Sequence, residues 1–289
     1  MSGLLAVGGS GVAQAAPASA GTASINLDWN GDGHADLLVV NNLDGNLYSY
    51  DGNGNNVSGQ GFADLLGTRI GTAWSGLRNV IRVSNWPGES GETVVAVRSD
   101  GELLGYPTDG HGRFLGPIFD IGARWNQFSI VVGATNFAGD GLPDVLGMLP
   151  NGDLYLWEFG PSGWVKPNGQ LIGCGFNVFD QIVAMRWTTN GHLGLLGHTS
   201  GGALRFYEGD GAGGFATITG VQIGSGFVGA FGPPFQLVSV GDWNGDGMAD
   251  LLTVDGAGDL SLYEGNGTGG WLSPTGSMSG TGFKPMRVF

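Results

Sequence analysis

The sequence repeats itself five times, and this repetition limits the fold more than any other feature of the chain. The nine residues Asp28–Asp36 return almost unchanged as Asp242–Asp250, and three weaker copies lie between them. A period of this length is typical of repeat architectures such as propellers and solenoids. The first position of each copy is Asp28, Asn85, Asn136, Arg186 and Asp242, in steps of 57, 51, 50 and 56 residues.

Two aromatic landmarks keep the same period. One closes a Gly-x-Leu run, and its five copies are Tyr50, Tyr106, Trp157, Tyr207 and Tyr263. The other closes an Ile-Gly or Ser-Gly run, and its five copies are Trp74, Trp125, Phe176, Phe227 and Phe283. Three landmarks in register indicate five structural units of one kind.

Each unit reads as four short strands separated by turns rich in Gly, Asp and Asn. In the last unit the predicted strands are Leu237–Val240, Leu251–Val254 and Leu260–Tyr263, with a weaker fourth run around Trp271–Ser277. Four antiparallel strands form one propeller blade. The sequence therefore predicts an all-β fold, a five-bladed β-propeller of four-stranded antiparallel blades.

The predicted organisation is a leader over residues 1–20 and a single propeller domain over residues 21–289. The C-terminal Met286–Phe289 occupies the register of Leu237–Val240, so we expect it to be handed back to the first blade and to close the ring. The alternative is the frayed start of an absent sixth blade. The five repeats span approximately residues 25–80, 81–131, 132–182, 183–236 and 237–289.

Composition narrows the range of partners. Charged residues make up 12% of the chain and the net charge is −14, with only two lysines, Lys166 and Lys284. Nucleic acid is not expected as a partner because it requires basic patches. Membrane insertion is not expected because no apolar run reaches the length of a span. We expect a monomer.

The first 20 residues resemble the end of a secretory signal peptide. Small residues at Ala13–Ala15 or Ala18–Ala20 offer a cleavage site, although a basic segment before them is missing. The chain is therefore expected to be secreted, the alternative being a disordered Ala/Gly-rich tail. Cys174 is the only cysteine, so no disulfide within the chain is possible.

The nine-residue repeats supply the chemistry that points to a metal. Asp28, Asn30, Asp32 and Asp36 stand at positions 1, 3, 5 and 9, and His34 at position 7 offers its carbonyl. Calcium prefers this spacing of oxygens. Position 12 is Val39, where an EF-hand needs Glu, so this loop is not an EF-hand. The second full copy has Asp242, Asn244, Asp246, Met248 (by its carbonyl) and Asp250.

The other three copies lose the oxygen ligands in stages. One keeps Asn136, Asp140 and Asp144 but has Ala138 at position 3, which predicts weaker binding. The copies that begin at Asn85 and Arg186 lack the carboxylates. The alternative for all five is an Asx-rich turn that caps its own backbone.

The Asp-x-Asn-Gly-Asp-Gly-x-x-Asp-Leu-Leu pattern, the Gly-x-Leu-x-Leu-Tyr run and the Ile-Gly-x-Gly-aromatic close resemble FG-GAP/VCBS-type repeats of secreted bacterial proteins. The resemblance covers residues 25–289 and is diluted in the second and fourth units. It implies β-propeller blades with calcium in the loops. The Ile-Gly-x-Gly-Trp close and the period are also similar, more weakly, to five-bladed tachylectin-type lectins.

Trp74, Trp125, Phe176, Phe227 and Phe283 are candidate ligand-binding residues, because aromatic faces beside polar turns stack on sugar rings. The alternative is that they pack one blade against the next, as we also expect for Tyr50 and its four equivalents. The aromatic at the second loop position, Trp29 in the first copy, is expected to be a packing residue too.

Signatures of catalysis are few, and no catalytic residue is assigned. Gly209–Gly214 and Gly265–Gly270 match Gly-x-Gly-x-x-Gly but lie between predicted strands, so they are expected to be hairpin turns. The four histidines, of which His198 is the last, are expected to be solvated loop residues without zinc spacing.

Three functions follow from these observations. The first is a secreted, calcium-stabilised binding or adhesion module that recognises carbohydrate or a cell-surface protein, and that is not an enzyme. The second is a structural or assembly module without a ligand of its own. The third is a propeller-type glycan lyase or hydrolase.

Overall fold

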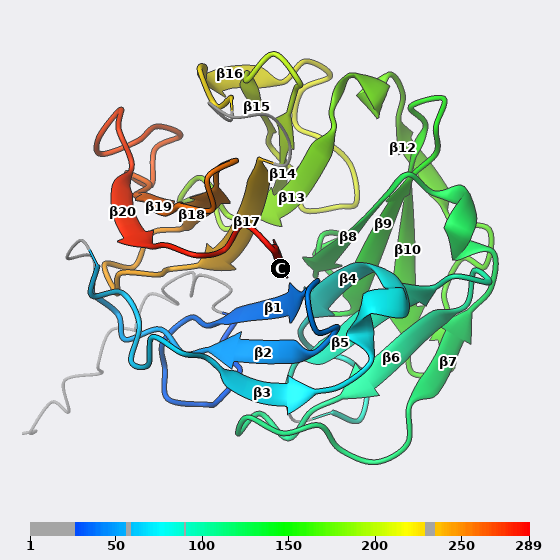
Figure 1. The fold of residues 1–289 in the computed structure, drawn as a ribbon. Coiled ribbons are helices and arrows are strands. Elements are labelled where there is room, and N and C mark those ends of the chain that lie inside the picture. The colour runs from blue at the N-terminus through cyan, green and yellow to red at the C-terminus, as the bar shows by residue number, and fades with distance from the viewer. Residues whose placement is uncertain (1–26, 56–58, 90, 229–234) are drawn as a thin grey trace, which may run out of the picture.

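The computed structural model describes residues 27–55, 59–89, 91–228 and 235–289. Its strands form five antiparallel sheets set around a central axis (Figure 1), so the predicted five-bladed β-propeller is confirmed. The leader predicted over residues 1–20 lies outside the described residues.

Each blade has four main strands, and the innermost strands of neighbouring blades line the centre of the ring. From the centre outward, blade 1 has β21 (Met286–Val288), β1 (Leu37–Asn41), β2 (Leu47–Tyr50) and β3 (Thr68–Gly71). Blade 2 has β4 (Leu77–Val83), β5 (Thr93–Arg98), β6 (Leu103–Pro107) and β7 (Phe119–Gly122), and blade 3 has β8 (Ile130–Thr135), β9 (Pro143–Met148), β10 (Leu154–Gly160) and β12 (Gln170–Gly173). Blade 4 has β13 (Gln181–Met185), β14 (Gly194–His198), β15 (Leu204–Tyr207) and β16 (Val221–Gly224), and blade 5 has β17 (Gln236–Gly241), β18 (Asp250–Val254), β19 (Leu260–Tyr263) and β20 (Ser277–Gly280).

The C-terminal strand closes the ring, as predicted. β21 pairs with β1, with Val288 opposite Val39 and Met286 opposite Asn41. The backbone also joins at Phe289, which exchanges hydrogen bonds with Leu38 in both directions. Because β21 supplies the innermost strand of blade 1, the alternative of a frayed sixth blade is wrong.

The fourth strand of blade 5 lies later in the chain than predicted. β20 begins at Ser277, whereas Trp271 belongs to the preceding loop and forms only an isolated bridge with Gly265. Pro274 lies within the predicted run and has no N–H to donate to a ladder. The Ile-Gly landmark is therefore the fourth strand itself in blades 1 to 4, and the aromatic after it begins the step to the next blade.

That step is a single 3₁₀ turn at three of the five positions: η1 (Trp74–Gly76), η2 (Trp125–Gln127) and η3 (Phe176–Val178). A residue with positive φ precedes each turn, for example Arg124 at 69°. The described part of the chain contains no helix of the length and apolar character that crossing a bilayer needs.

Blade 3 carries one addition to the repeated plan. Its third strand β10 extends to Gly160 and turns into the two-residue strand β11 (Gly163–Trp164), which pairs back on it. Phe159 lies opposite Trp164 in this hairpin. The insertion brings a tryptophan to the outer part of the interface between blades 2 and 3.

The core lies between the blades. The second strand of each blade is buried on both faces, and all four leading residues of β1, for example, are fully buried. Such strands read as continuous apolar runs rather than as alternating ones. We call the interface between two neighbouring blades a seam and name it by the two blades, so that the 2–3 seam lies between blades 2 and 3.

Candidate functional site

The loop Asp28–Asp36 is held by its own side chains. Asp28 accepts hydrogen bonds from the N–H groups of Gly31, Asp32 and Gly33 at 2.7, 3.2 and 2.8 Å. Asp36 is fully buried and accepts from the N–H of Trp29 at 2.8 Å and of Gly52 at 2.8 Å. These bonds define one compact turn that leads into β1, in which Asp36 is buried and Asp32 is exposed.

The loop Asp242–Asp250 repeats this network bond for bond. Asp242 accepts from the N–H of Gly245, Asp246 and Gly247 at 2.7, 3.0 and 2.8 Å. Asp250 is fully buried and accepts from the N–H of Gly265 at 3.1 Å. The repeated nine residues therefore encode a repeated three-dimensional structure.

The acid at position 9 lies in the most apolar surroundings of each loop. Burial raises the pKa of Asp36 from 3.8 to about 7, although the Gly52 N–H and the Arg82 guanidinium oppose this shift. Burial also raises the pKa of Asp144 and of Asp250 to about 7. In Asp144 one buried carboxylate oxygen, Oδ1, has no hydrogen-bond partner among the described residues.

The three remaining loops differ as their sequences indicate. Asn136 adopts a positive φ of 59° and accepts from the N–H of Gly141 at 2.6 Å. Asp140 accepts from the N–H of Leu142 at 2.9 Å. Asn85 also has a positive φ, of 63°, and Arg186 lies at the edge of the central cavity.

The donors of the two full loops are the right chemical type for calcium, but their present contacts are to the backbone. Asn30 accepts from the N–H of Asp32, and Asp32 accepts from the N–H of His34, both at 2.9 Å. Within residues 27–55, 59–89, 91–228 and 235–289, no three His, Cys, Asp or Glu side chains form a group that could hold a metal ion. Calcium would have to share oxygens that already accept N–H groups.

A further acid adjoins the blade 5 loop and was not anticipated. Glu264, directly after β19, accepts from the amide of Asn244 at 2.8 Å. Glu208 holds the same place in blade 4 and accepts from Thr188 at 2.9 Å. The signal was an acidic residue one position after the Gly-x-Leu-x-Leu-Tyr run.

The five candidate ligand-binding aromatics occupy one repeated position, but their rings lie inside the seams. Their exposed fractions are 5, 3, 6, 8 and 3% for Trp74, Trp125, Phe176, Phe227 and Phe283. In the 2–3 seam, Trp125 packs on Trp157 with ring centres 4.9 Å apart. The equivalents of Trp157, including Tyr50, pack in the same way, as predicted.

A second repeated aromatic set, which was not predicted from the sequence, completes the seams. Each member comes from the outer part of one blade and contacts the aromatic that closes the preceding blade. Its members are Phe62, Phe114, Trp164, Phe215 and Trp271. The signal was present as an aromatic seven or eight residues after the end of the Gly-x-Leu run in four copies, Phe114, Trp164, Phe215 and Trp271, whereas Phe62 lies twelve residues after it.

Four rings of this second set are partly exposed, in contrast to the closing aromatics: Phe114, Trp164, Phe215 and Trp271. Two are also fixed by their indole N–H groups. Trp164 donates to the carbonyl of Ile121 at 2.9 Å, and Trp271 donates to the carbonyl of Ile223 at 2.8 Å. The two indoles are therefore held in place, and all four rings keep part of their surface in solvent.

The aromatics at the second loop position are packing residues, as expected. Trp29 is 2% exposed and lies against Phe114, and Trp243 is 1% exposed and lies against Phe62. The glycine-rich segments 209–214 and 265–270 are turns between strands, which confirms their interpretation as hairpin turns.

His198 departs from the prediction of a solvated loop residue. It lies in β14 with 3% exposure, its Nδ1 is 2.5 Å from a carboxylate oxygen of Asp180, and its Nε2 is 2.7 Å from the carbonyl of Phe227. It ties blade 4 to the chain that leads to blade 5. The prediction failed because Gly194–His198 is a buried central strand whose last side chain turns inward.

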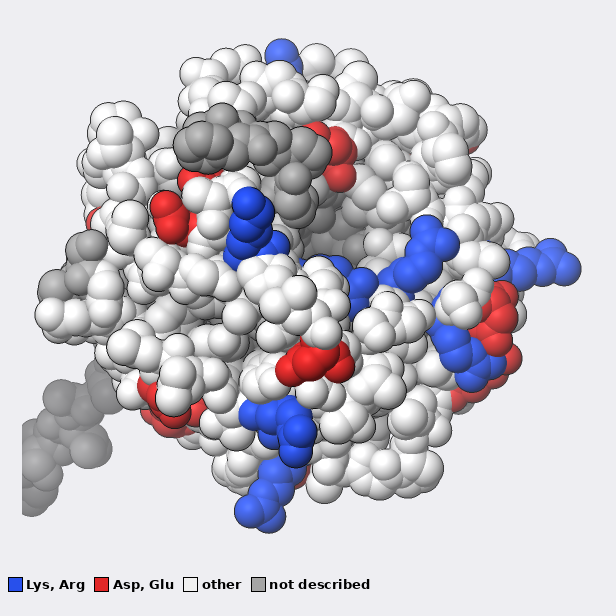
Figure 2. Space-filling model, in the orientation of Figure 1, with Lys and Arg blue, Asp and Glu red and all other residues white. Residues whose placement is uncertain are grey.

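The centre of the ring holds a cavity of about 360 Å³. Figure 2 shows a hollow at the centre of one face, with basic side chains beside it. All five innermost strands contribute to its wall, which is mainly aliphatic and includes Arg82, Arg186 and Arg287.

Comparison with known proteins assigns no family to this chain. No protein-family model and no curated protein matches this chain. Among solved structures, it is similar to the BP39L lectin from Burkholderia pseudomallei, with 18% identity, 88% of this chain and 67% of that chain covered, and a TM-score of 0.49. It is also similar to a triple mutant of AofleA from Arthrobotrys oligospora, with 14% identity, 82% and 66% coverage, and a TM-score of 0.47. The FG-GAP/VCBS resemblance stays a prediction.

Proposed function

We propose that this chain is a carbohydrate-binding propeller whose sites lie at the outer ends of the seams. The observation that carries the proposal is the second aromatic set, in which a partly exposed ring recurs in four of the five seams. Aromatic faces beside polar groups bind the apolar faces of sugars. No catalytic residue is part of the proposal.

The 2–3 seam offers the best-formed candidate. Trp164 stacks on Trp125 with ring centres 5.8 Å apart and leaves part of its indole in solvent. The same hairpin carries Glu158 and Lys166, whose charged atoms are 3.8 Å apart, and Lys166 also contacts Gln170. One aromatic ring beside an acid, a base and an amide is the combination that recognises a sugar by stacking and by hydrogen bonding.

Repetition of the site provides the binding strength. A single stacking site in water binds weakly, but several sites on one rigid ring engage a multivalent glycan together and raise the overall affinity by avidity. We therefore propose a branched or repeated glycan as the ligand rather than a free monosaccharide.

A glycan array tests the proposal, with Trp164→Ala and Trp271→Ala as the informative variants. We expect the wild type to bind a limited group of glycans, and each variant to bind them at least about 10-fold more weakly with an intact fold. Leu43→Ala serves as a control because that side chain is 82% exposed and lies in the turn between β1 and β2. Unchanged binding by both informative variants would contradict the proposal.

We further propose that calcium binds the two full loops, at Asp28–Asp36 and Asp242–Asp250, and more weakly at Asn136–Asp144. Support comes from the hard oxygen donors and from a turn already bent around them. Calorimetry on the chelator-treated protein should show heat for two sites that is lost in the double variant Asp28→Ala, Asp242→Ala. An absence of heat, with no change in melting temperature, would exclude calcium.

The outer strands favour a second candidate function, an assembly module. Exposed aliphatic side chains lie in the outer loops and fourth strands of several blades, among them Leu66, Ile218 and Leu272 at 83, 97 and 61% exposure. Exposed apolar patches mark interaction sites when they are contiguous. A sedimentation experiment that finds only monomers, in the presence of bound glycan, would favour the first function.

We also propose that the protein acts outside the cell. Support comes from residues 1–20, which resemble the end of a secretory signal peptide. Expression of the full chain with detection in the medium, and sequencing of the mature N-terminus, tests this directly.

A further inference from the structure

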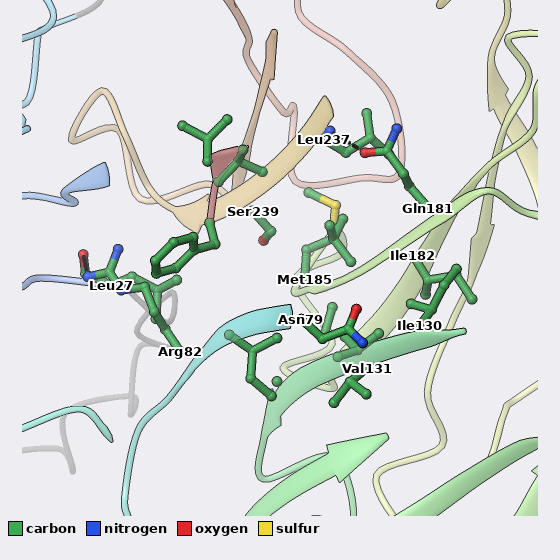
Figure 3. A pocket seen from close by; sticks show the side chains of 18 of the residues that line it. Leu27, Asn79, Arg82, Ile130, Val131, Gln181, Ile182, Met185, Leu237 and Ser239 are labelled. Carbon is green, nitrogen blue, oxygen red and sulfur yellow. Dashed lines mark hydrogen bonds between the residues drawn. The ribbon is translucent and has the colours of Figure 1, made fainter. Parts of the chain in front are cut away.

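The central cavity differs from the seams in that it is enclosed by aliphatic side chains. Figure 3 shows Ile130, Val131, Ile182 and Leu237 around the hollow, with Met185 on its wall. A volume of about 360 Å³ falls within the range of small-molecule sites. An aliphatic wall offers few hydrogen bonds to water, so the cavity favours an apolar ligand.

The cavity is long as well as apolar. Every residue from Asp180 to Arg186 lines it, so it follows the whole innermost strand of blade 4. At about 3.3 Å per residue, this run corresponds to roughly 20 Å. An extended chain of about ten carbon atoms is shorter than this distance.

The wall of the cavity carries a cation that forms no salt bridge among the described residues. Arg287 in β21 donates to the carbonyl of Leu77 at 2.7 Å and to that of Trp74 at 3.4 Å, and within the described residues it forms no salt bridge. A guanidinium has five N–H groups, so three remain, and its Nε is buried without a partner. Burial lowers the pKa of Arg287 with no acidic group acting on it.

Two other charged groups that line the cavity have charged partners, and Arg186 is a further cation of its wall. Arg82 forms a buried pair with Glu92 at 2.6 Å. The carboxylate of Asp180 is held by His198 at 2.5 Å. The charge that the cavity offers to a ligand is therefore positive, in a protein whose net charge is −14.

We propose that the central cavity binds an amphipathic monocarboxylate, with its carboxylate on Arg287 and its aliphatic chain along the wall of β13 and β17. This binding is separate from the carbohydrate sites at the seams and does not depend on them. The charge selects an acid over the corresponding alcohol, and the aliphatic wall selects a chain over a small anion such as acetate.

Titration calorimetry with decanoate, decan-1-ol and acetate on the full chain tests the proposal. The wild type should bind decanoate saturably, bind decan-1-ol roughly 10-fold more weakly, and not bind acetate detectably. Arg287→Met keeps the apolar stem and should remove the preference for the acid while the alcohol still binds. Equal affinity of the wild type for acid and alcohol would overturn the role of Arg287.

A second variant tests whether decanoate binds in the cavity or on the exposed apolar side chains of the outer strands. It changes β17 and leaves the closing strand β21 as it is. Ser239 in β17 lines the hollow, so Ser239→Trp should fill it and abolish decanoate binding, while glycan binding is unchanged. Ser162→Trp, at an exposed turn, is the matched control and should bind decanoate like the wild type. Decanoate binding that survives in a folded Ser239→Trp protein would overturn the cavity as the site.

Discussion

The side chain of Gln236 in β17 forms two hydrogen bonds with the backbone of β21, at Met286 and Val288, as a neighbouring strand would. Its amide donates to the carbonyl of Met286 at 2.8 Å, and its oxygen accepts the N–H of Val288 at 3.0 Å. Gln181 makes the same pair of bonds to Phe235 and Leu237, one seam earlier. One side chain thus joins the last blade to the strand that closes the ring.

Loss of these bonds should weaken closure specifically. Gln236→Ala and Gln181→Ala are each expected to lower the free energy of unfolding by about 1–3 kcal/mol, because two backbone groups lose a partner. Deletion of residues 286–289 should itself lower the melting temperature sharply. In the shortened chain, Gln236→Ala should lower the free energy of unfolding almost no further, whereas Gln181→Ala should lower it as it does in the full chain. Chemical denaturation of the wild type, the shortened chain and the two substitutions in each of them, six proteins in all, measures this. Equal effects of the two substitutions in the shortened chain would refute a role of Gln236 in closure.

Arg82 fastens the first loop to blade 2. It pairs with Glu92, with exposures of 1% and 4%, and donates to the carbonyls of Asp36 and Leu27. Arg82→Met leaves a buried carboxylate unpaired and should cost about 3–5 kcal/mol of stability. Arg98→Met removes the pair with Asp100, in which both side chains are about half exposed, and should cost at most about 1 kcal/mol. Urea denaturation of the two variants measures both losses of stability. Similar losses in Arg82→Met and Arg98→Met would contradict the prediction.

Gly209 meets the backbone of a neighbouring strand with no room for a side chain. A Cβ there would lie 2.0 Å from the carbonyl oxygen of Leu193, and at Gly52 it would lie 2.0 Å from that of Ala35. Gly209→Ala should destabilise the protein by at least about 1–3 kcal/mol, since the backbone must move. At Gly76 a Cβ meets no atom within 4 Å, so Gly76→Ala is the control and should change stability by less than about 0.5–1 kcal/mol. Thermal melts of both variants test the difference.

The buried acids predict an unusual pH dependence in the chelator-treated protein. The pKa of Asp36, Asp144 and Asp250 rises from 3.8 to about 7 on folding, so the folded state binds protons more tightly than the unfolded state. This contribution is complete below about pH 4 and is lost as the pH rises through about 7. The melting temperature should therefore fall between pH 5 and pH 8, with a smaller fall in Asp144→Asn. A melting temperature that rises over this interval would contradict the prediction.

Much of the architecture could be predicted because the repeat is local. The period, the four strands of a blade and the turn at Asp28–Asp36 all depend on residues within one unit, and five copies of each signal reinforce one another. Closure was also predictable, since Met286–Phe289 matches the first strand of blade 5. The fourth strand of that blade was misplaced because Trp271 looks like a strand residue until Pro274 and the bridge to Gly265 are considered together.

The sequence by itself determined the five-bladed ring, its closing strand and the repeated acidic turns, because strand and turn preferences act over a few residues. Only the tertiary structure decided which repeated aromatics are buried and which keep a face in solvent. Trp125 and Trp164 are 39 residues apart and meet only because two blades pack side by side. The central cavity and the isolated charge of Arg287 likewise arise only when five innermost strands, each from a different repeat, surround one axis.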